Sequence, residues 1–242
     1  KRQWPNYCDV TLIEQEYLDP MPLFPISAYK SPMETMKTVR SFGFIRDCLA
    51  IDPTMKSVIL SSRKSYTRDA TTRFSANTGY QYINYLEDPT CTSDHIINQA
   101  ESLWKDEKLR QIVIIDEMKS VLDQFNSPFH ETHNHNRLFD NRRVFDDYIR
   151  NARYLLVLDA DLDTECTDFI HGLRPRDNIY LVHNIIMKRS EYTAIYYDSI
   201  VQFLGNIEYS LSNKKPALVS DSYKFGKIME TMFNFGNHRY YS

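Results

Sequence analysis

The sequence predicts an α/β protein with a parallel β-sheet flanked by helices. Short apolar runs alternate along the 242 residues with longer amphipathic stretches, and this alternation is typical of parallel strands joined by crossover helices. Polar residues follow most of the apolar runs, as expected where parallel strands end at one edge of a sheet. That edge is therefore the place to search for a ligand site.

Five apolar runs and one weaker run at the start are the predicted strands. In chain order they are Ile26–Tyr29, Ser57–Ser61, Ile112–Ile115, Tyr154–Leu158, Ile179–Val182 and Ala217–Val219. The predicted helices between them are Thr38–Ala50, Tyr66–Ala76, Phe139–Arg153, Glu165–Leu173, Glu191–Leu211 and Tyr223–Phe233. The polar, basic passage Asn184–Ser190 predicts a domain boundary, with one domain at 1–186 and a second at 187–242.

The composition excludes several classes of protein. A net charge of -3 provides no overall attraction to nucleic acid, so such contacts would need local basic patches. Four widely spaced cysteines contain no C-x-x-C pair, which argues against a zinc ribbon or a disulfide framework and favours a reducing compartment. No apolar run approaches the roughly 18 residues of a membrane span. Because the sequence starts at Lys1 and stops just after a helical pattern, we expect a fragment of a longer protein.

The first motif is the octet Ser31–Thr38, Ser-Pro-Met-Glu-Thr-Met-Lys-Thr, between a predicted strand and a helix. Its Lys-Thr ending is that of a phosphate loop, in which Lys37 would reach phosphate oxygens and Thr38 would bind Mg²⁺. Glu34 and Met36 occupy the positions where such loops have glycine. Taken alone, the octet is better interpreted as a surface turn before a helix.

The second motif is Val113–Glu117, an apolar strand that ends in two acids. Asp116 could hold Mg²⁺, and Glu117 could orient or deprotonate an attacking water. A solvated strand end is an equally good interpretation of this pair alone. We expect Asp116 and Lys37 to lie side by side, on neighbouring strands of one sheet.

Two further motifs follow predicted strands. The stretch Ser61–Arg68 brings hydroxyls and cations to a helix start, which suits contact with a phosphate backbone or a solvated helix end. In Leu156–Asp163, three acids alternate after a buried strand. Capping of the next helix accounts for Asp163 but does not readily account for Asp159.

A polar segment, Ser127–Asn136, is predicted to be a surface loop. It includes His130, Glu131, His133 and His135, residue types that can bind zinc. Because no second cluster supplies further ligands at a recognised spacing, a loop is the favoured interpretation.

These motifs in this order, with Gln99–Trp104 and Asp123–Pro128, resemble the herpesvirus-type origin-of-replication-binding protein family of superfamily 2 DNA helicases. The resemblance runs from about Tyr29 to about Met232, and Lys215–Ser222 resembles the first strand of a second motor domain. It implies a RecA-like P-loop NTPase domain at 1–186, carrying motifs I, Ia, II and III, followed by the beginning of a second RecA-like domain.

The resemblance also implies ATP and Mg²⁺ as cofactors, and single-stranded or origin DNA and other replication proteins as partners, with no membrane. Lys37 and Glu117 would be catalytic, Thr38 and Asp116 would hold the metal, and Asp159 and Asp161 would couple the site to a neighbouring domain. The ATP loop would comprise Ser31, Pro32, Met33, Glu34, Thr35, Met36, Lys37 and Thr38, and the nucleic-acid contacts Ser62, Arg63, Lys64, Ser65 and Arg68. An intracellular location follows, in the nucleus or at a viral replication site.

The two replaced glycines, at Glu34 and Met36, predict that hydrolysis is impaired. One alternative is a catalytically inactive helicase-like module that binds nucleic acid or protein. A small-molecule kinase is a third, but a kinase has no need of the strand-contacting motif at Ser61–Arg68. The later motifs of the second motor domain and an origin-reading domain are not in this sequence.

Overall fold

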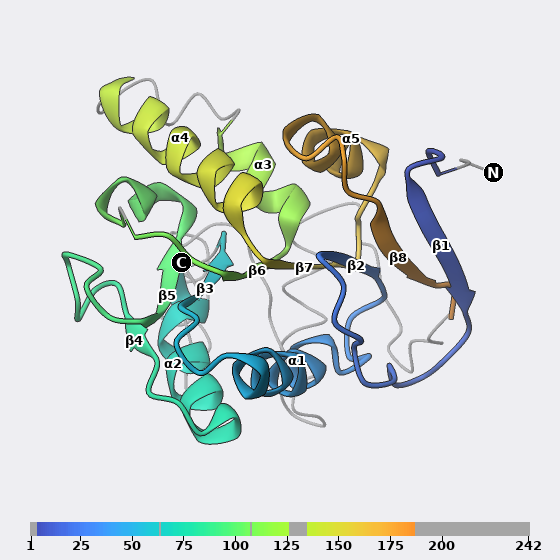
Figure 1. Cartoon of the computed structure of the whole chain (residues 1–242), viewed down its shortest axis with the longest axis horizontal. Coiled ribbons are helices and arrows are strands. Elements are labelled where there is room, and N and C mark those ends of the chain that lie inside the picture. Colours follow the sequence, from blue (N-terminus) through green and yellow to red (C-terminus); the bar gives the residue numbers. More distant parts are fainter. Residues whose placement is uncertain (1–3, 63, 107, 126–134, 187–242) are drawn as a thin grey trace, which may run out of the picture. The chain divides into compact units, whose positions relative to one another are not determined.

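The protein's computed structural model describes residues 4–62, 64–106, 108–125 and 135–186. It contains an eight-stranded sheet in the order β1-β8-β2-β7-β6-β3-β5-β4, with every pair parallel (Figure 1). The strands are β1 (Cys8–Ile13), β2 (Ile26–Lys30), β3 (Ser57–Ser61), β4 (Ile83–Asn84), β5 (His95–Gln99), β6 (Ile112–Asp116), β7 (Tyr154–Asp159) and β8 (Ile179–Asn184). The helices are α1 (Lys37–Ile51), α2 (Lys64–Thr78), η1 (Ala100–Lys105), α3 (Met118–Phe125), α4 (His135–Asn151) and α5 (Thr164–Leu173).

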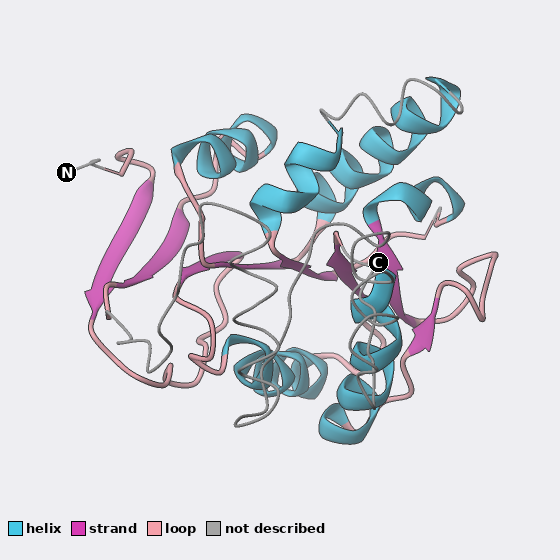
Figure 2. Cartoon of the chain, turned by 180° about the vertical axis from the view of Figure 1, so that it is seen from behind, coloured by secondary structure: helices cyan, strands magenta, loops and turns pink. Residues whose placement is uncertain are grey.

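Helices cover both faces of the sheet. Helices α1 and α2 lie on one face, and α3, α4 and α5 lie on the other, as the two opposite views show (Figures 1 and 2). Because successive strand residues point to opposite faces, Ile114 packs with the α1 and α2 side while Val113 packs with the α3 to α5 side. On the first side, the rings of Phe42 and Phe74 meet edge to face at 4.8 Å. The α/β prediction with a parallel, helix-flanked sheet is therefore confirmed.

Most predicted elements are present, often with longer bounds. The strand at Ser57–Ser61 is as predicted, and β2, β6, β7 and β8 each extend one or two residues further. The predicted helices in this part of the chain correspond to α1, α2, α4 and α5. The structure also contains β1, β4, β5, η1 and α3, which periodicity did not predict.

Asn184 belongs to the sheet rather than to a linker. It ends β8, is 3% exposed, and its side-chain amide donates to the backbone oxygen of Gln15 (2.7 Å) and to Ser31 Oγ (3.1 Å). Its side-chain oxygen accepts from the backbone N–H of Gln15 at 3.1 Å. A polar residue thus ends the strand because its hydrogen bonds are satisfied inside the fold.

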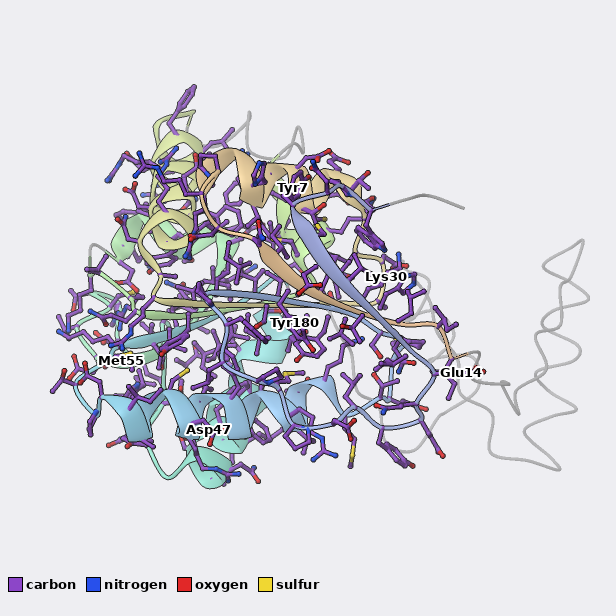
Figure 3. All side chains as sticks on the ribbon, turned by 45° about the vertical axis from the view of Figure 1, so that its right-hand side comes forward. Tyr7, Glu14, Lys30, Asp47, Met55 and Tyr180 are labelled. Atoms are coloured by element: carbon purple, nitrogen blue, oxygen red, sulfur yellow. The ribbon has the colours of Figure 1, made fainter. Side chains whose placement is uncertain are left out.

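The edge strand β1 is fastened by the residues that precede it. Tyr7, which lies beside α5 (Figure 3), stacks on His171 of that helix with ring centroids 3.9 Å apart, and its hydroxyl donates to Asp168 of the same helix. Pairing then runs in register from Cys8 beside Ile179 to Ile13 beside Asn184. The amino-terminal segment is therefore an integral part of the sheet.

Contacts divide the chain into a unit at Lys1–Lys188 and a unit at Arg189–Ser242. The predicted strand at 217–219, the predicted helices at 191–211 and 223–233, and most of the predicted loop at 127–136 lie outside the described residues. The boundary at 186/187 and the second RecA-like domain stay predictions. Within the described ranges, no helix combines the length and apolarity that crossing a bilayer requires.

A buried ion pair holds the segment that precedes β6. Arg110 and Asp106 have fully buried side chains joined by bonds of 2.9 and 3.0 Å. The same guanidinium donates to the backbone oxygens of Ser93 (2.7 Å) and Cys91 (3.1 Å). The hydroxyl of Tyr148 on α4 donates to Asp106. Burial, and after it the negative charge of Asp106, raises the pKa of Tyr148 well above its usual value. One arginine thereby connects the 91–94 loop to α4 through Asp106.

We predict that Arg110→Met lowers the free energy of unfolding by about 3–5 kcal/mol, because it leaves the Asp106 charge buried and unpaired. Urea unfolding measures the loss. The matched control is Arg150→Met, which removes a half-exposed arginine paired with Asp146 and Asp147 on α4 and should cost less than about 1 kcal/mol. Equal losses in the two variants would show that the buried pair has no special role.

Candidate functional site

The loop between β2 and α1 adopts a glycine-like backbone without glycine. Glu34 and Met36 have φ values of 62° and 64°, in the left-handed region. Met36 is also the residue at which α1 is capped, and its side chain makes no capping hydrogen bond. For residues with a Cβ atom this conformation costs roughly 1–2 kcal/mol each. The loop shape therefore does not follow from the conformational preferences of Glu34 and Met36, and other contacts impose it.

The contacts that impose the loop shape are hydrogen bonds, most of them made by buried side chains. Ser31 Oγ donates to Thr35 Oγ1 at 2.7 Å, and Thr35 Oγ1 donates to the backbone oxygen of Pro32 at 2.9 Å. The backbone oxygen of Thr35 accepts from the N–H of Leu18 at 3.1 Å. Ser31 and Thr35 are each 1% exposed. These bonds fix both ends of the turn that contains Glu34.

Lys37 points back into this loop. Its ammonium group donates to the backbone oxygen of Ser31 and, at 3.0 Å, to that of Pro32. Burial lowers its pKa, while the negative charges of Asp116, Asp159, Glu117 and Asp161 act in the opposite direction. The lysine therefore lies within the electrostatic field of the acids at and just after the ends of β6 and β7.

A cavity of about 360 Å³ at the carboxyl edge of the sheet brings these residues together. Residues Met33 to Thr38 line it from one side, and Asp116, Glu117, Asp159 and Asp161 line it from the other. The predicted triphosphate loop, metal residues and catalytic residues thus share one cavity. Whether they perform those roles stays a prediction.

The expectation that Lys37 and Asp116 stand on neighbouring strands was wrong. Strand β7 lies between β2 and β6, because Tyr29 pairs with Leu158 and Leu158 pairs with Asp116. Two strand spacings, roughly 10 Å, therefore separate β2 from β6. The loops after β2 and β6 meet only by converging across the end of β7.

Asp159 occupies that end of β7 and bonds to both sides. Its backbone oxygen accepts from the N–H of Ser31 at 3.1 Å. Its carboxylate, in a residue 5% exposed, accepts from the backbone N–H groups of Lys119 (2.8 Å) and Asp161 (2.7 Å). Asp159 therefore caps the start of α3, a partner that the sequence did not indicate. Asp163 caps α5 as predicted, accepting from the N–H of Cys166 at 3.2 Å.

The 61–68 segment reaches the same acids. Ser62, the residue that follows β3, donates from its hydroxyl to Glu117 Oε2 at 3.3 Å. Glu117 itself has a φ of 61°, and its N–H donates to the backbone oxygen of Leu158 at 2.8 Å. Arg68 is exposed on α2, whereas Arg63 and the side chains of Lys64 and Ser65 lie outside the described part of the chain.

Sequence reasoning missed two polar residues of the cavity. Arg73 of α2 and Ser120 of α3 both line it, and Arg73 is paired with Asp69 at 3.4 Å. No spacing rule identifies Arg73, because it lies in an ordinary charged stretch of helix. Lys30, at the end of β2 (Figure 3), lines a second, acidic cavity and donates to the backbone oxygen of Leu162 at 2.6 Å. No group of three or more metal-ligating side chains occurs among the described residues.

Comparison with solved structures supports the fold. Mss116p (NTE and C-tail double deletion), whose structure is bound to ssRNA and AMP-PNP, matches with a TM-score of 0.56 and 14% identity. The match covers 86% of this chain and 50% of that chain. At this identity the likeness shows the fold alone, which is RecA-like, as predicted.

Comparison with sequences identifies the family. The chain is 27% identical over 180 residues to the replication origin-binding protein of Gallid herpesvirus 2, covering 67% of this chain and 20% of the relative. It is 25% identical over 164 residues to that of Varicella-zoster virus, covering 65% and 19%. The chain therefore spans about a fifth of the length of these relatives. A family model described as origin of replication binding protein matches residues 16–209, and the chain accordingly belongs to that family.

Proposed function

We propose that this domain binds Mg·ATP at the 31–38 loop and the phosphate backbone of single-stranded DNA at the 62–68 segment, as the first motor domain of an origin-binding helicase. The observation that carries the proposal is the shared cavity, where Lys37 and Thr38 face Asp116 and Glu117. The names of the viral relatives support an origin-binding role. The structure of Mss116p contains AMP-PNP and ssRNA, and these two ligands support the choice of a nucleotide and a single-stranded nucleic acid for this domain.

The donor set of the cavity fits a metal-bound triphosphate. Five carboxylates, those of Glu34, Asp116, Glu117, Asp159 and Asp161, line it against the two cations of Lys37 and Arg73. A bare triphosphate would be repelled by this excess of like charge. A bound Mg²⁺ offsets the phosphate charge and prefers the oxygen ligands that Asp116 and the Thr38 hydroxyl offer.

Each residue then has a defined task. Lys37 would exchange its bonds to the Ser31 and Pro32 oxygens for phosphate oxygens, and the backbone N–H groups of the loop would hold the same phosphates. Glu117 would orient the attacking water and accept its proton. Asp159 would keep α3, and with it Glu117, in place through its cap.

We propose that hydrolysis is slow because of Glu34 more than Met36. Glu34 and Met36 have left-handed conformations in the folded protein itself. Their strain therefore makes folding less favourable, and it is the same in every state that keeps the loop shape. Glu34 instead adds a negative charge beside the phosphates. Its side chain is exposed, so at roughly 5 Å and a dielectric near that of water the repulsion is about 1 kcal/mol per unit charge. A catalytically inactive binding module is the second candidate, and this charge is the observation in its favour.

Replacing Glu34 with Gly should raise the affinity for Mg·ATP about fivefold or more, because about 1 kcal/mol of repulsion disappears. Calorimetry measures the affinity, with EDTA as the condition that should abolish binding. Glu34→Gln is the matched variant, since it removes the charge and keeps the length. A wild-type chain that binds no Mg·ATP, with no gain in either variant, would contradict nucleotide binding.

Met36→Gly should raise the free energy of unfolding by about 0.5–1 kcal/mol, because the left-handed strain at Met36 exceeds the entropy that glycine adds to the unfolded chain. Met36 is 42% exposed, so little apolar burial is lost. The control is Met33→Gly in the same loop, where φ is not positive and the change should destabilise. Urea unfolding of both variants decides, and equal destabilisation would rule out strain at Met36.

Single-stranded DNA should bind weakly, without sequence preference, and less tightly as salt rises, because each phosphate contact releases counterions. Arg63→Ala with Lys64→Ala should lower the affinity for every oligonucleotide and reduce the slope of log affinity against log salt by about 1–2. Arg176→Ala, an exposed arginine before β8 at the opposite edge of the sheet, should leave both unchanged. Fluorescence anisotropy across a salt titration measures these values, and a salt-independent affinity would contradict the assignment.

A further inference from the structure

We infer that Glu117 and a DNA backbone phosphate compete for the hydroxyl of Ser62 as a hydrogen-bond donor. DNA binding would therefore displace Glu117 from its contact with Ser62. This inference rests on the proposed function and adds a link between its two sites. Ser62 then has two roles: it holds the Glu117 carboxylate in its present position, and it contacts the DNA backbone.

The first observation is the contact itself. Ser62 Oγ donates to Glu117 Oε2 at 3.3 Å, across neighbouring strands in which Ser61 pairs with Asp116. Hydrogen bonds between oxygens usually measure about 2.5–3.0 Å. The contact is therefore long and weak, and a better acceptor can replace it.

The second observation is that the backbone of Ser62, a residue 8% exposed, is held in place by hydrogen bonds. The backbone oxygen of Ser62 accepts from Gln124 Nε2 of α3 at 2.7 Å and from Gln99 Nε2 of β5 at 3.5 Å. Gln99 is held in turn by Tyr85, whose hydroxyl donates to Gln99 Oε1 at 2.8 Å. Rotation about the Cα–Cβ bond thus redirects the hydroxyl without moving the strand.

Competition follows from the chemistry of a serine hydroxyl. It carries one proton to donate, and a carboxylate and a phosphate are both negatively charged acceptors. Both cannot accept that proton at once, and they repel each other at such a distance. A phosphate bound at Ser62 therefore excludes the Glu117 carboxylate from its present contact.

Strand order gives this displacement a direction. Strand β6, which leads to Glu117, has β3 on one side and β7 on the other, with the 31–38 loop beyond β7 on β2. The contact with Ser62 draws the Glu117 carboxylate toward β3, on the far side from the phosphate loop. Glu117 also lines the cavity that Lys37 lines, and losing the contact with Ser62 removes a bond that holds its carboxylate on the β3 side.

A double-mutant cycle on DNA affinity tests the inference without requiring hydrolysis. Glu117→Ala should tighten binding of a fluorescent oligothymidylate about threefold to tenfold, because it removes the competing acceptor. Asp123→Ala removes an equal charge from α3, beside Gln124, and should tighten it less than twofold. In the Ser62→Ala background the Glu117→Ala gain should fall to the Asp123→Ala value, and Ser62→Thr should restore it.

The outcomes distinguish failure of the competition at Ser62 from failure of the proposed DNA site. If the oligonucleotide binds in a salt-dependent way and Glu117→Ala equals Asp123→Ala, the competition is refuted and the proposed strand binding stands. An undiminished Glu117→Ala gain in the Ser62→Ala background would also refute it. If the wild-type chain binds no oligonucleotide, the proposed strand site fails and this inference fails with it.

Discussion

The bonds of Asp159 determine how the rest of the site is arranged. This residue ends β7, between the strand that leads to the phosphate loop and the strand that leads to Glu117. Its backbone oxygen holds Ser31 and its carboxylate holds the first turn of α3. A parallel sheet aligns strand ends at one edge but leaves about 4.8 Å between neighbours. A residue that bonds in both directions is what joins loops two strands apart into one cavity.

The phosphate loop illustrates a division between shape and chemistry. Its shape comes from Ser31, Thr35 and Asn184, which are buried and bonded to one another and to the segment before β2. The chemistry that we propose for it depends on Lys37 and Thr38, which follow the turn. Glu34 and Met36 lie between these groups, and the turn persists although neither residue is glycine.

Sequence reasoning succeeded where one physical signal dominated. Buried strands such as Val113–Ile115 and helices long enough for several turns were recognised from periodicity, and the order of the polar motifs indicated the family. It failed at β1, where the exposed polar residues Asp9 and Thr11 interrupt the apolar run, and at β5, where buried Asn98 and Gln99 replace apolar residues. The neighbouring-strand expectation failed because strand order is a long-range property that local sequence does not encode.

The pairing of β1 with β8 has a consequence for the time course of folding. Cys8 pairs with Ile179, so β1 leaves the ribosome well before β8 and must wait for it before its backbone N–H and C=O groups find their partners. At roughly 5–20 residues per second, that delay is on the order of ten to thirty seconds. Contacts so distant in sequence also slow refolding. During synthesis, the exposed backbone of residues 8–13 is an unpaired strand edge open to aggregation or to chaperones.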